Sequence, residues 1–492
     1  MLAAILWLTT LLSHAATDSQ CDALLHVRTS TLTVTASELI PGAEMASRHY
    51  AGLPSVCRIT ATLRPSADSD IHMELWLPEP HAWNGKYEGT GNGGWGGSID
   101  QNALATAVRG GYAASSSDTG HKGGSAKFAM GHPEKLIDFG YRAIHEMTVA
   151  SKLLIETYYG RPPELAYFQG CSSGGRQALM EAQRFPSDYD GIIAGAPTNN
   201  WTRMMFERIW VAQATLNDPA SYIPPAKYPM VHKAVLAACD GLDGVQDGVL
   251  EDPRRCSFDP AVLECKAGDA PGCLTKPQVA AARRIYTPAT NPRTGEQIFP
   301  PMERGSELVW ARLAGGPKPI QLADDHFKYI VFENPGWDFR TLNFDRDFAA
   351  AMAKDNGVLS ATDPDLGPFF KRGSKLIQYH GWTDQQVMPE NSIDYFEEVR
   401  AKVGAAADSS YRLFMAPGMN HCGGGDGPNR FDMVTALEQW REQGKPPDQI
   451  LALHERDGKV DRTRPLCPYP QIAKYSGTGS TDDARNFTCT RP

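Results

Sequence analysis

One stretch of this 492-residue chain decides its fold class: Leu165-Ala166-Tyr167-Phe168-Gln169-Gly170-Cys171-Ser172-Ser173-Gly174-Gly175-Arg176. Its pattern predicts a short strand over 165–168, a glycine-rich turn, and a helix over 176–184. The turn contains G-x-S-x-G between the strand and the helix, and glycines there leave room for a serine in a strained conformation. Ser172 is therefore a candidate nucleophile, and a purely structural glycine turn is the alternative.

The regions on either side of this stretch continue the alternation of strands and helices. The sequence predicts strands over 31–34, 59–63, 71–77, 375–379 and 411–415, and a helix over 137–159. Such alternation indicates a parallel sheet flanked by helices, so we expect an α/β fold.

A serine hydroxyl needs a base to remove its proton and a carboxylate to orient that base. In α/β-hydrolases these groups follow the nucleophile in the order acid, then histidine. Asp384 and His421 come after the two late strands, where the carboxyl ends of parallel strands converge. We expect them to complete a triad with Ser172. Three rivals remain open: Asp363, Asp365 and His380.

Size and composition limit the possible classes of protein. The chain has 41% hydrophobic and 21% charged residues, as an ordinary globular protein does. Its length exceeds what one core usually organises, which predicts a second domain or a large insertion. The net charge of −9 and the absence of a Lys/Arg cluster argue against a nucleic-acid or membrane partner.

The N-terminal segment has the pattern of an export signal. An apolar run over 2–12 precedes Ser13-His14-Ala15, whose small residues suit signal peptidase, so we predict a signal peptide over 1–15 and a secreted protein. The positively charged start is missing, and a buried N-terminal helix is the alternative. No later segment is apolar enough to span a membrane.

Ten cysteines, an even number, indicate disulfides in an exported protein. Proximity favours three local pairs: Cys239 with Cys256, Cys265 with Cys273, and Cys467 with Cys489. The other four, Cys21, Cys57, Cys171 and Cys422, pair among themselves in an order that the sequence leaves open.

Two of these cysteines flank the candidate triad. Cys171 directly precedes Ser172, and Cys422 directly follows His421. A disulfide holds its Cα atoms about 5.5 to 6 Å apart, so a bond between the two would bring nucleophile and base together. Two unrelated structural cysteines are the alternative.

With this Cys-Ser, Asp and His-Cys pattern the chain resembles the tannase and feruloyl esterase family over nearly its whole mature length. The resemblance implies a Cys171–Cys422 disulfide, and we expect Cys21 to pair with Cys57. It further implies an α/β-hydrolase domain over 16–199 and 363–492, interrupted by a lid domain over 200–362.

The resemblance also implies an activity. We expect a serine carboxylic ester hydrolase that acts on small aromatic acid esters, such as feruloyl or other hydroxycinnamoyl esters, through an acyl-enzyme on Ser172. Galloyl esters and terephthalate monoesters are alternative substrates. A non-catalytic binding protein and a serine peptidase are the more distant alternatives.

A glycine-dense loop over 89–97 follows an early predicted strand. In α/β-hydrolases the oxyanion hole combines an amide from such a loop with the amide after the nucleophile. We therefore expect the backbone amides of Gly93 and Ser173 to stabilise the oxyanion, and a flexible turn is the alternative.

The predicted lid contains a segment rich in carboxylates, with aspartates at 240, 243 and 247 separated by glycines. Hard oxygen ligands at this density suit calcium, although the spacing differs from an EF-hand and surface Asp-Gly turns are the alternative. The resemblance implies a structural Ca²⁺ held by the side chains of Asp240, Asp243 and Asp247 and the carbonyls of Val245 and Val249.

The predicted lid is also rich in aromatic side chains, of which we expect two or three to line the substrate pocket. The candidates are Trp201, Phe206, Trp210, Trp310, Phe327, Tyr329, Phe332 and Trp337. Three arginines are candidates to meet a substrate carboxylate: Arg304, Arg312 and Arg340.

Overall fold

A computed structural model describes residues 20–47 and 50–492. The predicted signal peptide over 1–15 lies outside the described residues. The chain forms two compact units: the first comprises residues up to 124 together with 131–192, and the second comprises 125–130 and 193–492. Within the described ranges, every helix is too short or too polar to cross a membrane.

The main sheet has nine strands in the order β1-β2-β3-β5-β4-β6-β7-β10-β11. The pairs at the β1 end are antiparallel, and β4 with β6 and β10 with β11 are parallel. This mixed sheet with its helices confirms the predicted α/β class. The strand bounds are Leu32–Ile40 (β1), Val56–Leu63 (β2), Ile71–Pro78 (β3), Lys86–Thr90 (β4), Ala113–Ser117 (β5), Leu165–Cys171 (β6), Gly191–Gly195 (β7), Lys375–Gly381 (β10) and Tyr411–Ala416 (β11).

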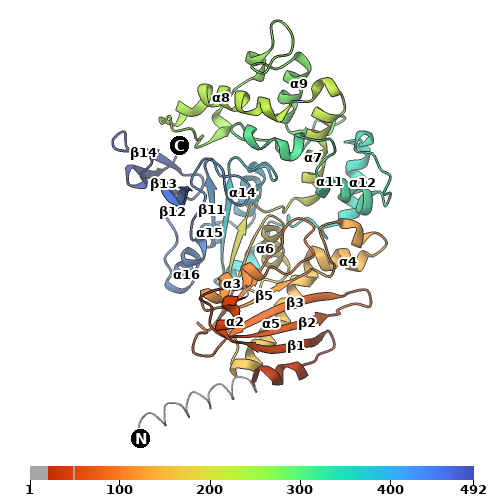
Figure 1. Ribbon diagram of the computed structural model, residues 1–492, viewed down its shortest axis with the longest axis vertical. Coiled ribbons are helices and arrows are strands. Elements are labelled where there is room, and N and C mark those ends of the chain that lie inside the picture. The colour runs from red at the N-terminus through yellow and green to blue at the C-terminus, as the bar shows by residue number, and fades with distance from the viewer. Residues whose placement is uncertain (1–19, 48–49) are drawn as a thin grey trace. The chain divides into compact units, whose positions relative to one another are not determined.

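The first unit packs α3 (Gln101–Arg109) and α5 (Ala143–Tyr159) against its strands (Figure 1). Asp100 caps α3 by accepting the amides of Asn102 and Ala103. α6 (Ser173–Arg184) follows β6 after a single residue, so the turn at the motif is tighter than the sequence pattern predicted.

The predicted helix over 137–159 is interrupted in the structure. It is divided into α4 (Pro133–Ile137), a π-helical turn (Asp138–Arg142) and α5. The fully buried Arg176 of α6 donates to the carbonyls of Phe139 (3.1 Å) and Gly140 (2.7 Å) in that turn. A wide turn exposes carbonyls, and this guanidinium satisfies them, so a partner distant in sequence stabilises the interruption.

The second unit contains the two late parallel strands, α14 (Glu390–Val403), α15 (Ala405–Ser410) and α16 (Met433–Gln443). Two C-terminal hairpins, drawn in blue to violet in Figure 1, pair β12 (Ile450–Arg456) with β13 (Lys459–Leu466) and β14 (Ile472–Tyr475) with β15 (Phe487–Thr490). Residues 200–362 all belong to this unit, and their limits as a lid stay a prediction. Their longer helices are α7 (Trp201–Leu216), α8 (Tyr228–Cys239), α9 (Lys276–Ile285) and α12 (Arg346–Asp355).

Half of the aromatic candidates form the interior of the second unit. Phe206 makes edge contacts with Phe327, Phe344 and Phe348 at centroid distances of 5.0 to 5.7 Å. Four candidates have no exposed surface: Trp201, Phe206, Trp310 and Phe327. These side chains supply core packing, and the half-buried ones are better placed to meet a ligand: Trp210, Tyr329, Phe332 and Trp337.

All ten cysteines are oxidised. The structure pairs Cys21 with Cys57, Cys239 with Cys256, Cys265 with Cys273, and Cys467 with Cys489. Cys171 and Cys422 are also disulfide-bonded. Each short loop closed in this way contributes about 2 to 4 kcal/mol to stability in the chain-entropy account.

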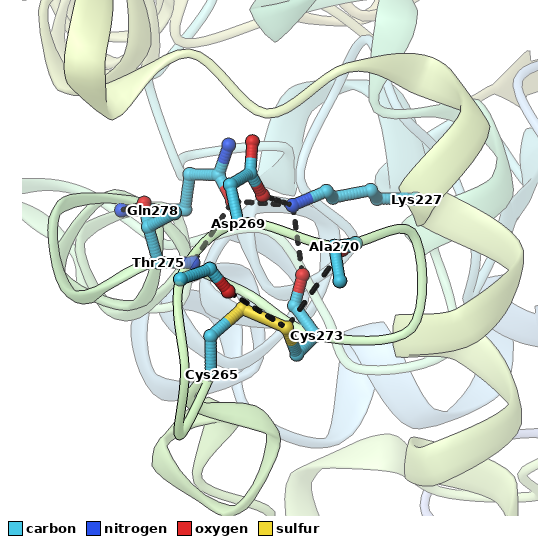
Figure 2. Close-up of a disulfide and its surroundings, with 8 residues drawn as sticks. Lys227, Cys265, Asp269, Ala270, Cys273, Thr275 and Gln278 are labelled. Atoms are coloured by element: carbon cyan, nitrogen blue, oxygen red, sulfur yellow. Dashed lines mark hydrogen bonds and ion pairs between the residues drawn. A yellow bond between two sulfur atoms is a disulfide. The ribbon is translucent and has the colours of Figure 1, made fainter.

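One disulfide, Cys265–Cys273, closes a small loop that a buried lysine anchors. Figure 2 shows Lys227 directed at this loop: its ammonium donates to the Cys273 carbonyl (2.8 Å) and Gln278 Oε1 (2.9 Å) and pairs with Asp269. Gln278 also forms a capping box with Thr275 at the start of α9. The loop is therefore fixed relative to α9.

Candidate active site

The first unit places Ser172 at the tip of a sharp turn. β6 ends at Cys171, α6 begins at Ser173, and Ser172 between them has φ 63° and ψ −121°. Residues with a side chain rarely adopt this conformation, and such strain is typical of functional positions. The geometry is that of a nucleophile elbow.

Close backbone packing explains the glycines around this serine. A Cβ on Gly170 would lie 2.6 Å from the Gly174 carbonyl carbon, and a Cβ on Gly91 would lie 2.5 Å from the Gly174 Cα. Both contacts are with backbone, which cannot move aside cheaply. The motif and the early glycine loop are therefore in van der Waals contact.

Hydrogen bonds fix the early glycine loop against α6. The Asn92 amide donates to Gln177 Oε1 (2.9 Å), and Gln177 Nε2 donates to Asn92 Oδ1 (3.1 Å). The Ser173 hydroxyl donates to the Gly94 carbonyl (2.8 Å). A Cβ on Gly93 would meet nothing within 4 Å, so this residue faces open space while its neighbours are held. The loop is ordered by these bonds and is not merely a flexible turn.

The second unit brings together the predicted acid and base. The fully buried Asp384 carboxylate lies 2.7 Å from His421 Nδ1 through its Oδ2 atom. Its Oδ1 atom accepts the backbone amides of Gln386 (2.7 Å) and Val387 (2.9 Å). The parallel pairing of β10 with β11 sets the two loops side by side, and a Cβ on Gly381 would lie 2.1 Å from the Met419 carbonyl oxygen.

The environment keeps Asp384 ionised. Burial alone would raise its pKa, but the charge of His421 and hydrogen bonds from His380 and His421 outweigh burial and hold the pKa below its usual range. An ionised carboxylate on Nδ1 fixes the imidazole tautomer that leaves Nε2 as the acceptor, which is the form a general base needs.

His380, the rival base, supports the acid instead. Its Nε2 atom lies 3.1 Å from Asp384 Oδ2 and 2.9 Å from the Val387 carbonyl, and Nδ1 lies 2.7 Å from the Ser392 hydroxyl. The ring is completely buried, so it cannot receive a proton from a substrate or nucleophile. The rival acids Asp363 and Asp365 are exposed and accept backbone amides two residues further along the chain.

Sequence reasoning missed two buried charged residues behind the acid loop, Glu207 and Arg208. Arg208 on α7 has almost no exposed surface and donates to the Gln386 carbonyl (2.5 Å), two residues after Asp384. Burial lowers the pKa of Arg208 to about 10, although the negative charges of Glu207 and Asp384 act in the opposite direction. Burial also raises the pKa of Glu207 to about 8. The available signal was two adjacent charged residues within an apolar stretch of α7, from Met204 to Val211.

A cavity of about 280 Å³ in the second unit lies beside the acid and base loops. Its lining includes Trp382, Thr383 and Asn420, which neighbour Asp384 and His421 in sequence, together with Arg304 and Leu308. This volume is near the lower end for small-molecule sites, roughly 300 to 1,000 Å³. Of the three candidate arginines, Arg304 contributes to this cavity, Arg312 donates to Gln386 Oε1, and Arg340 pairs with Asp338.

The carboxylates of the predicted calcium segment follow α8. Asp240 accepts the Gly248 amide, Asp243 accepts those of Val245 and Glu251, and Asp247 accepts that of Val249. Burial and the negative charge of Asp247 raise the pKa of Asp240. The hydrogen bond from the Gly248 amide acts in the opposite direction but is weaker. The structure shows the Arg464 guanidinium paired with Asp247. The donor set is entirely oxygen, as a hard cation requires.

Comparison with known proteins identifies the family. The profile described as "Tannase and feruloyl esterase" matches residues 57–490. An uncharacterized esterase of Xanthomonas campestris pv. campestris is 37% identical, over 97% of this chain and 92% of that protein. The probable feruloyl esterase B-1 of Aspergillus flavus is 34% identical, over 88% of this chain and 86% of that protein. The crystal structure of feruloyl esterase B from Aspergillus oryzae matches with a TM-score of 0.89 at 30% identity, over 96% and 100% of the two chains.

The fold predicted from the sequence and the expected enzyme class are thereby confirmed. The geometry around Ser172 and around Asp384 supplies the kind of groups that ester hydrolysis uses. This chain belongs to the tannase and feruloyl esterase family and is a carboxylic ester hydrolase.

Proposed function

We propose that this esterase cleaves small aromatic acid esters through an acyl-enzyme on Ser172, with His421 as general base and Asp384 as the group that orients it. The observation that carries the mechanism is the 2.7 Å contact between His421 Nδ1 and the buried Asp384 carboxylate. The strained conformation of Ser172 at the elbow supports its role as nucleophile.

The reaction takes two steps in this proposal. His421 Nε2 accepts the Ser172 proton as the oxygen attacks the ester carbonyl, and then returns that proton to the departing alcohol. Water next attacks the acyl-enzyme, with His421 again as base, and releases the acid and the free serine. Asp384 stabilises the imidazolium in both steps without taking the proton.

The amides of Gly93 and Ser173 are the proposed oxyanion donors. Ser173 opens α6, so its amide lies at the positive end of the helix. The hydrogen bonds that link Ser173 and Gln177 to the early glycine loop support a preorganised position for Gly93. Each such donor contributes about 2.7 to 4 kcal/mol to transition-state stabilisation in comparable enzymes.

Hydroxycinnamoyl esters, such as feruloyl esters, are the proposed substrates. The 34% identity to a probable feruloyl esterase supports this choice, and the 280 Å³ cavity beside the acid and base loops suits a single aromatic ring. A galloyl ester or a terephthalate monoester remains the competing substrate, since Arg304 in the cavity wall offers a charge to a free carboxylate.

Secretion is part of the same proposal. All ten cysteines are oxidised, a state that persists outside the cytosol. The proposed Cys171–Cys422 disulfide would join the chain beside the nucleophile to the chain beside the base.

The test is a panel of methyl ferulate, methyl gallate and a terephthalate monoester with the wild type and Ser172→Ala. We expect methyl ferulate to give the highest kcat/KM and Ser172→Ala to lose at least about 10³-fold on every ester while it keeps the wild-type melting temperature. A higher kcat/KM with methyl gallate or the terephthalate monoester would contradict the proposed preference for hydroxycinnamoyl esters. Full activity of Ser172→Ala would overturn the mechanism.

We also propose that the segment Asp240–Val249 binds a structural Ca²⁺, through the side chains of Asp240, Asp243 and Asp247 and the carbonyls of Val245 and Val249. Three carboxylates in one short segment support this, because the single guanidinium that pairs with Asp247, that of Arg464, compensates only part of their negative charge. Calcium should raise the melting temperature of the wild type relative to EDTA, and Asp243→Asn should abolish that increase. Asp338→Asn, a surface turn variant, is the control. An equal increase in Asp243→Asn would contradict the site.

A further inference from the structure

The first unit contains a cluster of one histidine and two carboxylates that the ester chemistry does not use. His145 lies on α5, Glu181 on α6, and Asp188 in the turn after α6. One nitrogen or oxygen from each of the three lies within 4.8 Å of the other two. His145 Nδ1 and Asp188 Oδ2 are 2.7 Å apart.

Glu181 is buried although no hydrogen bond among the described residues satisfies its carboxylate. Its side chain is 1% exposed, and both carboxylate oxygens lack a hydrogen-bond partner among the described residues. A buried carboxylate without partners costs several kcal/mol in stability, so proteins retain one where a ligand or a charge meets it. Its oxygen points into the cluster with His145 and Asp188.

The atoms that these three side chains offer indicate which metal ion the cluster would bind. One imidazole nitrogen and two carboxylate oxygens suit a borderline divalent cation such as Zn²⁺, which binds nitrogen at about 2.0 to 2.1 Å and oxygen at about 2.0 to 2.2 Å. Ligand atoms around such an ion lie roughly 3.4 Å apart. The His145 and Asp188 atoms would have to separate by less than ~1 Å.

The surroundings allow that adjustment. The His145 side chain is 29% exposed and the Asp188 side chain 10% exposed, so solvent reaches two of the three ligands. The His145 ring is stacked on Phe185 with centroids 3.9 Å apart and planes at 9°. Stacking fixes the ring plane, and the exposed part of His145 leaves one side of the cluster in contact with solvent, which would supply water as a fourth ligand.

The neighbouring cation is Lys152. Its ammonium donates to the backbone carbonyl of Asp188 and lies 5.9 Å from the Tyr189 ring centroid. Burial and the negative charge of Asp188 raise the pKa of Glu181, so a metal ion at this site would have to displace a proton from Glu181. A protonated Glu181 beside Asp188 is therefore the state that competes with the metal-bound state.

From this geometry we propose that His145, Glu181 and Asp188 form a structural zinc site that links α5 to α6. Glu181 lies nine residues after Ser172, about 13 Å along a helix, so the ion takes no part in the ester chemistry. Its effect is to hold the nucleophile helix against α5 and to stabilise the first unit.

The test uses the full-length enzyme after chelator treatment, in saturating calcium so that the Asp240 segment is occupied. Zinc binding is measured by competition with a chromogenic chelator, and melting temperature is measured with and without zinc. We expect the wild type to bind one zinc and to melt about 1 to 3 °C higher with it. Glu181→Gln and His145→Gln should each bind at least ten-fold more weakly and lose the increase.

A second histidine–carboxylate pair in the same unit provides the control. His132 Nδ1 lies 3.1 Å from the Asp68 carboxylate, both side chains are partly exposed, and no third ligand joins them among the described residues. His132→Gln should bind zinc as the wild type does. Absence of zinc binding in the wild type, or equal binding in His145→Gln, would overturn the site. The His145 side chain is partly exposed, so its variant remains informative even if Glu181→Gln fails to fold.

Discussion

Around Ser172 the first unit packs backbone against backbone, whereas around Asp384 and His421 the second unit buries charged groups and satisfies them with hydrogen bonds. The first arrangement depends on missing side chains, since Gly91 and Gly174 are in direct contact. The second depends on partners for a buried carboxylate, which accepts bonds from two imidazoles and two amides. The region around Ser172, here called the steric region, should therefore be destabilised by added side-chain volume. The region around Asp384 and His421 should lose activity when a charge is removed.

The largest effect on catalysis is expected from Asp384→Asn. The amide cannot stabilise the imidazolium and favours the wrong tautomer of His421, so kcat should fall about 10³- to 10⁴-fold. Steady-state kinetics on methyl ferulate measures the loss. Asp363→Asn, the exposed rival, should keep wild-type kcat. A loss of less than three-fold in Asp384→Asn would remove this residue from the triad.

The next effect concerns folding in the steric region. Gly91→Ala places a Cβ 2.5 Å from the Gly174 Cα and should cost about 1 to 3 kcal/mol of unfolding free energy or prevent folding. Gly93→Ala, two residues further along the loop, meets nothing within 4 Å and should retain wild-type stability. Urea denaturation of the two variants gives the comparison. If both variants lost the same unfolding free energy, the effect would come from the loop as a whole and not from the contact between Gly91 and Gly174.

A smaller effect on catalysis is expected at His380. Replacement by Phe removes a hydrogen bond to the ionised Asp384, worth about 1.5 to 3 kcal/mol, and should lower kcat about 10-fold or more with KM unchanged. His380→Gln can still donate to Asp384 and should recover part of kcat. Indistinguishable kcat values for Phe and Gln would indicate that packing alone is required there.

The smallest effect on catalysis is expected from Glu207→Gln, which should leave kcat unchanged but alter the pH dependence of stability. Unfolded Glu titrates near 4.3, and the native group near 8, so wild-type stability should fall as pH rises from about 4.3 to 8, by at most ~1.4 kcal/mol per pH unit. The Gln variant lacks this titration. Urea unfolding at pH 5 to 9 measures both, and parallel curves would contradict a raised pKa.

Local patterns predicted much of this molecule. Six of the nine strands of the main sheet, the elbow at Ser172 and the pairing of Asp384 with His421 follow from periodicity, turn residues and order along the chain, whereas β4, β5 and β7 were not predicted. These features depend on neighbours in sequence or on the shared edge of a parallel sheet.

Features that depend on distant partners could not be predicted in the same way. The π-helical turn is stabilised by Arg176, and the acid loop is bound by Arg208 from a helix far earlier in the chain. His380 is a second hydrogen-bond donor to Asp384, and only the structure shows this, because the sequence does not reveal that its ring is buried against that carboxylate. Burial of a polar group is a tertiary property, and one residue's identity does not reveal its partner.

The central claim is a covalent intermediate on Ser172, and the most direct measurement is labelling with a fluorophosphonate followed by peptide mass spectrometry. We predict a single adduct on Ser172, slower labelling in His421→Ala, and none at this position in Ser172→Ala, with all three proteins folded. Labelling of another residue at the wild-type rate, or an unlabelled wild type that still hydrolyses methyl ferulate, would contradict the mechanism.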